Sequence, residues 1–409
     1  MCKSVVQCPF YMGSVRIALV LKACCICLFL IAFCSPLIVV AGELTAVPAI
    51  ELKGEYDDNV SFLPRNEKAD FLATISPSLA VDYDTELLNL DSNIAVSFLR
   101  YADETYLDTE NQYYELAGAY NMMEKVQLKG DFSYVEDTTL ESELEETGLV
   151  GVRSNRERSK AGGGISYRVT EFSDIGFNYT HSETDYDWPG NVDYEYDVIS
   201  LSYNQQLKNN VDVFTGEPYY SWTDSSTSIV NNYGLLAGWS HRYTETMNLT
   251  VFLGPRYTKI EYDPVALSLP PDEPLSETSW GLVADIALQK DGEKFTAIVG
   301  YNRDLGRSSS GESIETNKLY CKVTQNISRR LLARVSGNLY FTKSEGRFFD
   351  EDRRHFDIVP ALNYKISEDH LIQFAYSYAY HNEKPQSIDR TYTRNRIWIA
   401  LVLRFPEKW

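Results

Sequence analysis

The chain has 409 residues, with 58 acidic and 38 basic side chains and a formal net charge of −20. So acidic a chain is a poor candidate for nucleic-acid binding, because proteins that bind nucleic acids neutralise the phosphates with a basic patch. Aromatic content is high, at 29 Tyr, 18 Phe and 6 Trp, yet the mean hydropathy of −0.30 is that of a soluble protein. Membrane barrels combine these properties because only one face of each strand meets lipid.

The beginning of the chain differs from the rest. Three basic residues precede an apolar run from Ala23 to Ala41, and Gly42 then follows a small residue, as at a signal-peptidase site. We therefore predict a cleaved secretory leader (signal peptide) over residues 1–41 and a mature domain over residues 42–409. The alternative is an uncleaved anchor, because an apolar run of this length could span a bilayer.

Most of the cysteines lie in this leader: Cys2, Cys8, Cys24, Cys25, Cys27 and Cys34. The mature chain would keep only Cys321, which excludes an internal disulfide or a cysteine metal cluster. Export is therefore inferred from the leader alone, and no cofactor or metal is expected. Loss of the three basic residues would move the net charge from −20 to about −23.

Beyond the leader, no apolar run approaches the length of a membrane helix. The recurring pattern is an alternation of apolar and polar residues, which is typical of strands with two different faces. The last strand shows it most clearly, with Ile397, Ile399, Leu401, Leu403 and Phe405 opposing Arg396, Ala400 and Arg404. In chain order, the pattern predicts strands that begin near residues 50, 69, 88, 111, 124, 159, 173, 193, 209, 229, 246, 277, 294, 315, 330, 352, 370 and 391.

The connections between these segments alternate in length. Short turns are expected at 121–124, 169–172, 206–209, 243–246, 289–293, 326–329 and 366–369, and long polar connections at 136–160, 182–193, 262–277, 305–314 and 381–390. Bacterial outer-membrane barrels have short periplasmic turns and long extracellular loops. The sequence therefore predicts an all-β, transmembrane, antiparallel up-and-down β-barrel of about 18 strands, with both termini in the periplasm. A soluble solenoid or propeller would show a fixed repeat length, which this chain lacks.

A short motif near the mature N-terminus supports this architecture. The turn Tyr56-Asp57-Asp58-Asn59 is followed by a strand that carries Pro77. This pairing resembles the second family of putative β-barrel porin proteins of proteobacteria. The resemblance implies an outer-membrane barrel over essentially the whole mature chain. Such proteins are often associated with exopolysaccharide gene clusters, so the resemblance adds saccharide as a candidate cargo.

No catalytic signature is present: the chain has no GxSxG elbow, no HExxH and no phosphate-binding glycine loop. The five histidines are scattered at different strand ends. His181-Ser182 and Ser240-His241 are adjacent in sequence, and neighbouring side chains on a strand point to opposite faces. Neither pair can form a dyad, and we predict that the chain is not an enzyme. A lipid-modifying barrel enzyme is the weaker alternative.

Charged residues on the polar side of the strands are predicted to face the barrel interior. On the lipid side, a mid-membrane Lys or Arg would cost roughly 2 to 4 kcal/mol. These candidate lumen-lining residues are Lys129, Asp131, Arg168, Arg256, Asp285, Lys318, Lys322, Arg334, Asp357, Arg396 and Arg404. Their pattern does not decide between an open channel and a closed interior, although about eighteen strands enclose more space than side chains fill.

Aromatic residues and one long connection each have two interpretations. Rings such as Tyr196, Tyr233, Trp239, Trp280 and Trp398 suit interfacial girdles, or, if they face inward, a stacking path for sugars. The long connection has an acidic arm (Glu136, Asp137, Glu141, Glu143, Glu145 and Glu146) and a basic arm (Arg153, Arg156, Arg158 and Lys160). We favour a solvated loop; the alternative is a loop folded inward that narrows the pore.

These features predict a location and partners. The final strand ends in Phe405, and the last residue is Trp409. A terminal aromatic resembles the signal read by the outer-membrane insertion machinery, which is therefore an expected partner along with the lipid bilayer and lipopolysaccharide. The preferred function is passive passage of hydrophilic solutes through a porin-like lumen. The rival is a non-conducting barrel that anchors an envelope complex.

Overall fold

The computed structural model describes residues 42–141, 143–144, 153–264, 275–307, 309, 311, 313–344, 352–384 and 390–409. The leader predicted over residues 1–41 lies outside the described residues. The strands are β1 Glu43–Asp57, β2 Asp70–Asp84, β3 Leu88–Tyr101, β4 Thr109–Met123, β5 Val126–Thr138, β6 Asn155–Thr170, β7 Ser173–Tyr186, β8 Tyr194–Gln206, β9 Asp212–Ser225, β10 Ser228–Thr244, β11 Met247–Tyr262, β12 Ser276–Asp291, β13 Phe295–Arg307, β14 Ser313–Asn326, β15 Leu331–Ser344, β16 Asp352–Lys365, β17 His370–Glu383, β18 Arg390–Arg404 and β19 Glu407–Lys408, with a 3₁₀ turn η1 at Thr105–Leu107.

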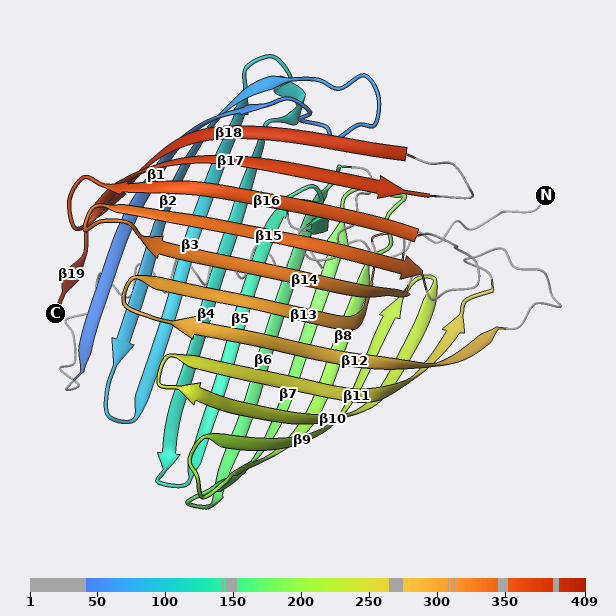
Figure 1. Cartoon of the computed structure of the whole chain (residues 1–409). Helices are drawn as coiled ribbons and strands as arrows, with labels where there is room; N and C mark the ends of the chain where they lie inside the picture. Colours follow the sequence, from blue (N-terminus) through green and yellow to red (C-terminus); the bar gives the residue numbers. More distant parts are fainter. Residues whose placement is uncertain are drawn as a thin grey trace, which may run out of the picture. The chain divides into compact units, whose positions relative to one another are not determined.

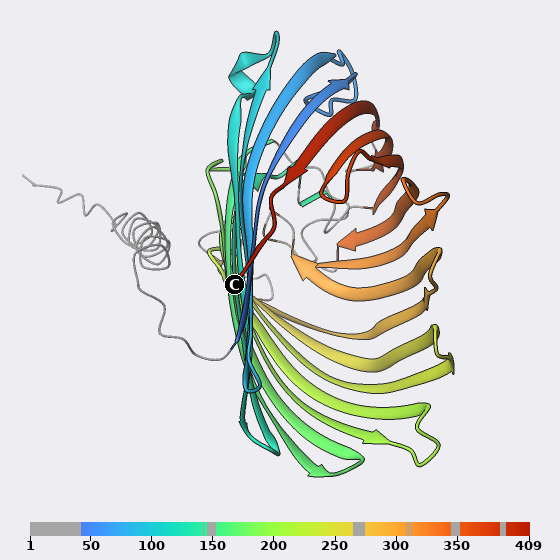
Figure 2. The same cartoon turned by 90° about the vertical axis from the view of Figure 1, so that its left-hand side faces the viewer.

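The first eighteen strands form one closed antiparallel barrel. Each strand pairs with the next along the chain, and β1 pairs with β18 to close the sheet. In Figure 2, strands of the first half of the chain form one wall, and those of the second half form the wall that faces it. The predicted fold class is confirmed. Seventeen of the predicted strand starts lie within about four residues of the observed ones, whereas β1 begins at Glu43, well before residue 50.

The two ends of the barrel differ in their connections (Figure 1). At one end, which we call the short-turn end, neighbouring strands are joined by brief segments such as 124–125 and 171–172. At the other, the long-loop end, most connections are longer, for example 58–69 and 139–154. The exception is 226–227, which joins β9 to β10 at the long-loop end with only two residues. Among the described residues, no helix has the length and apolar character needed to cross a membrane.

Large apolar side chains cover the outside of the barrel. Phe374 and Ile399 are 50% and 57% exposed, and nearly every long strand carries at least one exposed large apolar side chain. A soluble monomer rarely exposes an apolar surface this extensive, because burial of such surface is the main driving force of folding. A lipid-facing belt accounts for it, since the bilayer replaces water around these side chains.

Prolines explain the interruptions inside the ladders. Paired residues are missing in the middle of four ladders, and each gap includes one proline: Pro77, Pro218, Pro255 or Pro360. Proline has no N–H to donate to the neighbouring strand, so the ladder breaks locally and resumes in the same register. The inside-outside alternation is therefore unchanged across each of these gaps.

Candidate functional site in the barrel lumen

The strand register identifies the inner face. One cavity is lined by Glu51 and Lys53 of β1, by residues of β2 to β4, and by residues of β16 to β18 such as Asp357 and Arg396. Strands from both sides of the closing seam therefore share an interior space. Directly opposed residues on neighbouring strands point to the same face. The residue pairs therefore identify the inner face of every other strand, starting from the strands that line this cavity.

All eleven candidate lumen-lining residues fall on this inner face by register. Ten of them are at least partly exposed, and Arg256 is buried, at 1% exposure. Arg256 donates from Nε to the Thr258 hydroxyl at 3.0 Å, and its Nη1 lies 3.8 Å from a carboxylate oxygen of Asp304. Contact of the other ten with a permeating solute stays a prediction.

The short-turn half of the lumen has an exposed, charged wall. Asp82, Asp91, Glu115 and Asp131 line one cavity of about 400 Å³ on β2 to β5. The ammonium of Lys160 lies 3.7 Å from an Asp131 carboxylate oxygen, and both side chains are about half exposed. Exposed ion pairs of this kind contribute little to stability. These side chains can therefore respond to ions that enter the lumen.

The long-loop half is filled by a segment that folds inward. Leu140 and Leu144, each 6% exposed, pack in one cluster with Phe62, Ala379 and Tyr392. These partners come from the β1–β2 connection and from β17 and β18, whereas the leucines lie between β5 and β6. The solvated loop predicted over 136–160 is thus wrong for the described part, because apolar burial holds this segment inside.

Part of each charged arm of this segment lies in the barrel strands β5 and β6. Arg156, Arg158 and Lys160 lie in β6 on the inner face, and the Arg156 guanidinium is 3.8 Å from the Asp137 carboxylate of β5. Both side chains of this pair are at most 2% exposed. Residues 155–160 are all polar or charged, so the sequence shows no apolar–polar alternation there and the start of β6 was missed. Residues 145 and 146 of the acidic arm lie outside the described residues.

A second inward element meets this segment. Glu143 is 2% exposed, and its carboxylate accepts the backbone N–H of Ser309 at 3.0 Å. The carbonyl of Ser309 in turn accepts the N–H of Val192 at 2.7 Å. Ser309 belongs to the β13–β14 connection, and Val192 to the β7–β8 connection. Backbone and side-chain hydrogen bonds therefore join three connections at the long-loop end.

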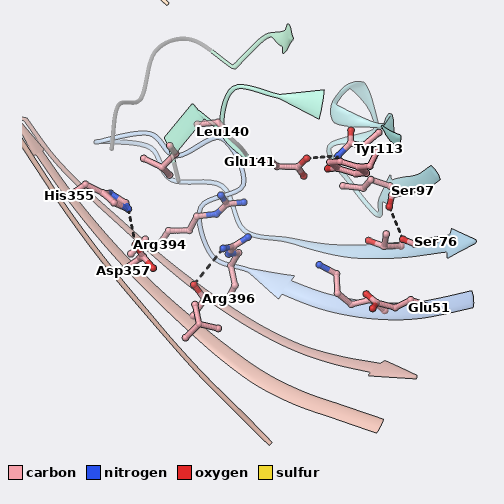
Figure 3. Close-up of a pocket in the computed structure, with 18 residues that line it drawn as sticks. Glu51, Ser76, Ser97, Tyr113, Leu140, Glu141, His355, Asp357, Arg394 and Arg396 are labelled. Carbon is pink, nitrogen blue, oxygen red and sulfur yellow. Dashed lines mark hydrogen bonds and ion pairs between the residues drawn. The ribbon is translucent and has the colours of Figure 1, made fainter. Parts of the chain in front are cut away.

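Beneath the inward segment lies the cavity that we regard as the candidate site (Figure 3). Its volume is about 350 Å³, and Leu140, Glu141 and Leu144 lie against its wall. The remaining wall is rich in hydroxyl and amide groups, among them Ser76 and Ser97, whose hydroxyls are 2.8 Å apart. Hydroxyls both donate and accept hydrogen bonds, so this wall suits polar solutes.

Three cations line the cavity, and two of them have carboxylate partners. Arg394 donates from Nε to Asp57 at 2.8 Å and also contacts this carboxylate through Nη2, and Lys53 donates to Glu55 at 2.8 Å. Arg396 contacts the hydroxyl of Ser377 at 3.5 Å. Across the part of the chain that the structure describes, no carboxylate lies within ion-pair distance of Arg396. Arg396 lines the cavity, so a solute that entered the cavity would meet its guanidinium.

Several polar atoms around the cavity are buried and lack a hydrogen-bond partner among the described residues. They are Thr74 Oγ1, Asn111 Oδ1, His355 Nδ1, Asp357 Oδ2 and Arg396 Nε. Such atoms are rare in folded proteins, and each one costs free energy until water or a ligand satisfies it. Both acceptors, such as Asn111 Oδ1, and a donor, Arg396 Nε, are among these atoms. No group of three or more His, Cys, Asp or Glu within the described ranges is arranged to hold a metal ion.

The structure brings together two histidines that the sequence left apart. His355 and His381 are opposed on β16 and β17, with ring centroids 5.9 Å apart, and both are at most 2% exposed. Tyr392 lies against His381 with a centroid distance of 5.3 Å. The expectation of scattered histidines is therefore wrong for this pair. Their separation by 26 positions gives no local motif, and only the strand register reveals it.

Aromatic side chains follow two patterns. Tyr220, Tyr233, Tyr257 and Trp280 are directly opposed across β9 to β12 on the outer face and form a row of ring contacts. Such a row is typical of an interfacial girdle, and Trp239 also faces outward. Tyr196 and Trp398 face inward by register, so their assignment to a girdle is wrong.

The C-terminal segment continues past the last long strand. Phe405 lies on the outer face, 52% exposed, and β19 then pairs with Thr45 and Ala46 of β1. Backbone hydrogen bonds link Trp409 and Leu44 in both directions. The role of Phe405 or Trp409 as an assembly signal stays a prediction.

Sequence reasoning missed Lys53, Arg394 and the inward leucines. Arg394 precedes Arg396 by two positions, so the alternation that placed Arg396 also places Arg394 inside. Lys53 follows the same pattern on β1, which was predicted to begin later than it does. Leu140 and Leu144 gave no such signal, because their burial depends on contacts with distant strands.

Comparison with known proteins supports the porin-like character of the chain. The family model described as "Putative beta-barrel porin 2" matches residues 38–193, which confirms the resemblance seen in the sequence. No curated protein matches the chain. Together with the closed sheet and its apolar outer face, the family match makes the chain a porin-like outer-membrane barrel.

Several solved structures align with most of the chain at low sequence identity. OccK2 (OpdF) of Pseudomonas aeruginosa aligns with a TM-score of 0.47 and 8% identity over 88% of this chain and 98% of its own. OccAB3 of Acinetobacter baumannii aligns at 0.45 and 10% identity over 88% and 99%, and OpdK of P. aeruginosa at 0.44 and 7% over 90% and 99%. Similarity at this level supports no inference about the solute.

Proposed function

We propose that the protein is a channel for passive passage of small hydrophilic solutes across the outer membrane. The observation that carries the proposal is the contrast between the two faces of one closed sheet. The outer face is apolar, whereas the inner face of the short-turn half exposes charged side chains such as Lys129, Asp131 and Arg404. An eighteen-stranded barrel also encloses more space than its own side chains fill.

Planar-bilayer recording of the purified, folded protein tests this proposal. We expect stable single-channel steps, with ion selectivity that depends on the inner charges. Silent bilayers that demonstrably contain the folded barrel would contradict the channel. They would favour the rival, a non-conducting barrel that anchors an envelope complex, which the filled long-loop half supports. Heat-modifiable gel mobility shows whether the inserted protein is folded.

The finer proposal is that the solute is a saccharide. The presence of both donors and acceptors around the cavity supports it, because sugar hydroxyls both donate and accept hydrogen bonds, and the cavity of about 350 Å³ has room for a small sugar. An added oligosaccharide should then block the current, whereas a neutral polymer of similar size should not. Equal block by both would show that only size matters.

We also propose that both termini are periplasmic, with the long-loop end facing lipopolysaccharide. Cysteine replacing Tyr106 or Trp188, which are 69% and 49% exposed, should react with impermeant reagents on whole cells in a Cys321→Ser background. Cysteine at Thr244 or Glu368, at the short-turn end, should not react. A reversed pattern would invert the sidedness. Ser309 is only 6% exposed and suits this test poorly.

A further inference from the structure

The candidate cavity beneath the inward segment has a surplus of negative charge. Lys53 forms an ion pair with Glu55 at 2.8 Å. Arg394 forms one with Asp57. These pairs neutralise two of the three cations that line the cavity, and the third is Arg396. Against this one remaining cation, the cavity wall carries three further carboxylates (Figure 3), those of Glu51, Glu141 and Asp357.

None of these three carboxylates is paired with a basic side chain of the described ranges. Glu141 accepts a hydrogen bond from the side-chain amide of Asn111. Nε2 of His355 lies 3.6 Å from a carboxylate oxygen of Asp357. Within the described residues, no Lys or Arg lies within ion-pair distance of Glu51, Glu141 or Asp357. The cavity should therefore attract a positively charged solute, because charges in a cleft with protein walls interact more strongly than they do in open water.

Buried polar atoms of the wall point to the same kind of solute. Asn111 is 2% exposed, and its Oδ1 has no hydrogen-bond partner among the described residues. The same holds for Oδ2 of Asp357 and for the hydroxyl of Thr74, which is 7% exposed. All three residues line the cavity. An ammonium group suits the two acceptor oxygens, because it carries three donors and no acceptor.

The rest of the wall calls for hydroxyl groups as well. Nε of Arg396 is a buried donor without a partner in the described structure, so it needs an acceptor oxygen. The hydroxyls of Ser76 and Ser97 can each donate or accept a hydrogen bond. A simple cation would leave Arg396 unsatisfied, and a neutral sugar would leave the carboxylates without a cation. A solute that carries an ammonium group beside several hydroxyls meets both needs.

We propose that the candidate cavity binds an amino sugar, that is, a saccharide that carries a protonated amine. The lining carboxylates attract its ammonium group, which donates to the acceptor oxygens of Asn111 and Asp357. Its hydroxyls satisfy Thr74 and Arg396. This inference rests on the proposed passage of a saccharide, and it names the class of sugar.

Titration calorimetry of the folded full-length barrel in detergent tests the proposal with two probes of the same size. Glucosamine carries an ammonium group where glucose carries a hydroxyl. We expect glucosamine to bind roughly tenfold more tightly, as a charge-assisted hydrogen bond would provide. High salt should reduce the difference, because it screens the charges. Equal affinity for the two probes, or tighter binding of glucose, would overturn the proposal.

Substitutions decide whether the preference arises in this cavity. Glu51→Gln and Asp357→Asn each remove one lining carboxylate, so each should reduce the preference for glucosamine several-fold. The matched control is Asp84→Asn, which removes an exposed inner-face carboxylate at the short-turn end of β2 and should keep the preference.

A preference that survives both cavity variants would overturn the assignment of the site. Binding in detergent needs no conduction, so it tests the amino-sugar site even if the bilayers are silent and the channel function fails. If the bilayers conduct, glucosamine should block the current more strongly than glucose.

Discussion

The two halves of the lumen are built from the same strands by the same alternation, yet they differ in what their inner side chains contact. Near the long-loop end, Arg156, Tyr340 and His381 are at most 2% exposed. Near the short-turn end, Lys129, Asp131 and Arg404 are exposed. Strand alternation therefore decides only which face a side chain occupies. The inward connections decide whether that face meets water or packed protein.

The two halves also differ in the free-energy cost of losing a charged side chain. In the long-loop half, charges are buried and paired, so removal of one partner leaves a desolvated charge behind. In the short-turn half, charges are hydrated, so a substitution mainly changes the field in the lumen. Mutations of charged residues in the long-loop half should therefore mainly lower stability, whereas those in the short-turn half should mainly change ion selectivity.

The largest effect is expected from the buried pair across the seam. Arg394→Met would leave Asp57, at 1% exposure, without its guanidinium. We expect a loss of about 3 to 5 kcal/mol in unfolding free energy, as for other broken buried pairs, measured by denaturant titration of the folded gel band. Lys408→Met, which removes an exposed pair with Glu43 at the opposite end, is the control and should have no measurable effect.

A smaller effect should follow from loosening the inward segment. Leu144→Asp places a charge in the cluster with Phe62 and Tyr392, which should release the segment and raise single-channel conductance. Leu144→Ala should raise the conductance less. It tests the same contact without introducing a charge, so the test still works if Leu144→Asp does not fold. Leu116→Ala, on the lipid face at 49% exposure, should leave conductance unchanged. Unchanged conductance in both Leu144 variants would show that the segment does not limit the current.

Charge reversal in the short-turn half should change selectivity and spare stability. Asp131→Lys or Asp285→Lys adds positive charge to the exposed inner face, so the reversal potential in a salt gradient should move toward anion preference. The same change at Glu110, on the outer face and 56% exposed, is the control. An equal shift from Glu110→Lys would mean that the effect arises outside the lumen.

The smallest effect concerns an exposed pair between two connections at the long-loop end. The hydrogen bond between Lys68 and Glu104, 2.8 Å long, raises the pKa of Lys68 and lowers the pKa of Glu104. The pair is thus intact at neutral pH, is lost in acid as Glu104 gains a proton, and is lost in alkali as Lys68 loses one. Because both groups are exposed, Glu104→Gln should leave the thermal midpoint unchanged at pH 7. A clear drop would reveal an ordering role for these connections.

Much of the barrel could be predicted because alternation is a local property. The strand that ends in Arg404 shows its two faces in sequence, and the same reasoning placed Asp131 and Asp285 on the inner side. The short turns could be found for the same reason, since a turn needs particular residues at particular positions.

The filling of the lumen could not be predicted in this way. Leu140 and Leu144 lie in a charged stretch, and their partners Ala379 and Tyr392 are more than two hundred residues away. By alternation Arg256 is an ordinary inner-face residue, whereas its burial comes with contacts to other strands, such as the 3.8 Å approach of its Nη1 to a carboxylate oxygen of Asp304 on β13. Long-range packing overrode the local pattern in both cases.

The closing seam has a consequence for how the barrel forms. The ladder between β1 and β18 joins residues 339 to 355 positions apart, and closing a flexible loop of that length costs on the order of 5 kcal/mol of chain entropy. Every other ladder among the first eighteen strands joins neighbours in sequence, so each can form as its own hairpin. The seam depends on the arrival of both ends of the barrel at one place. The pairing of β19 with β1 then lengthens the contact that holds these ends together.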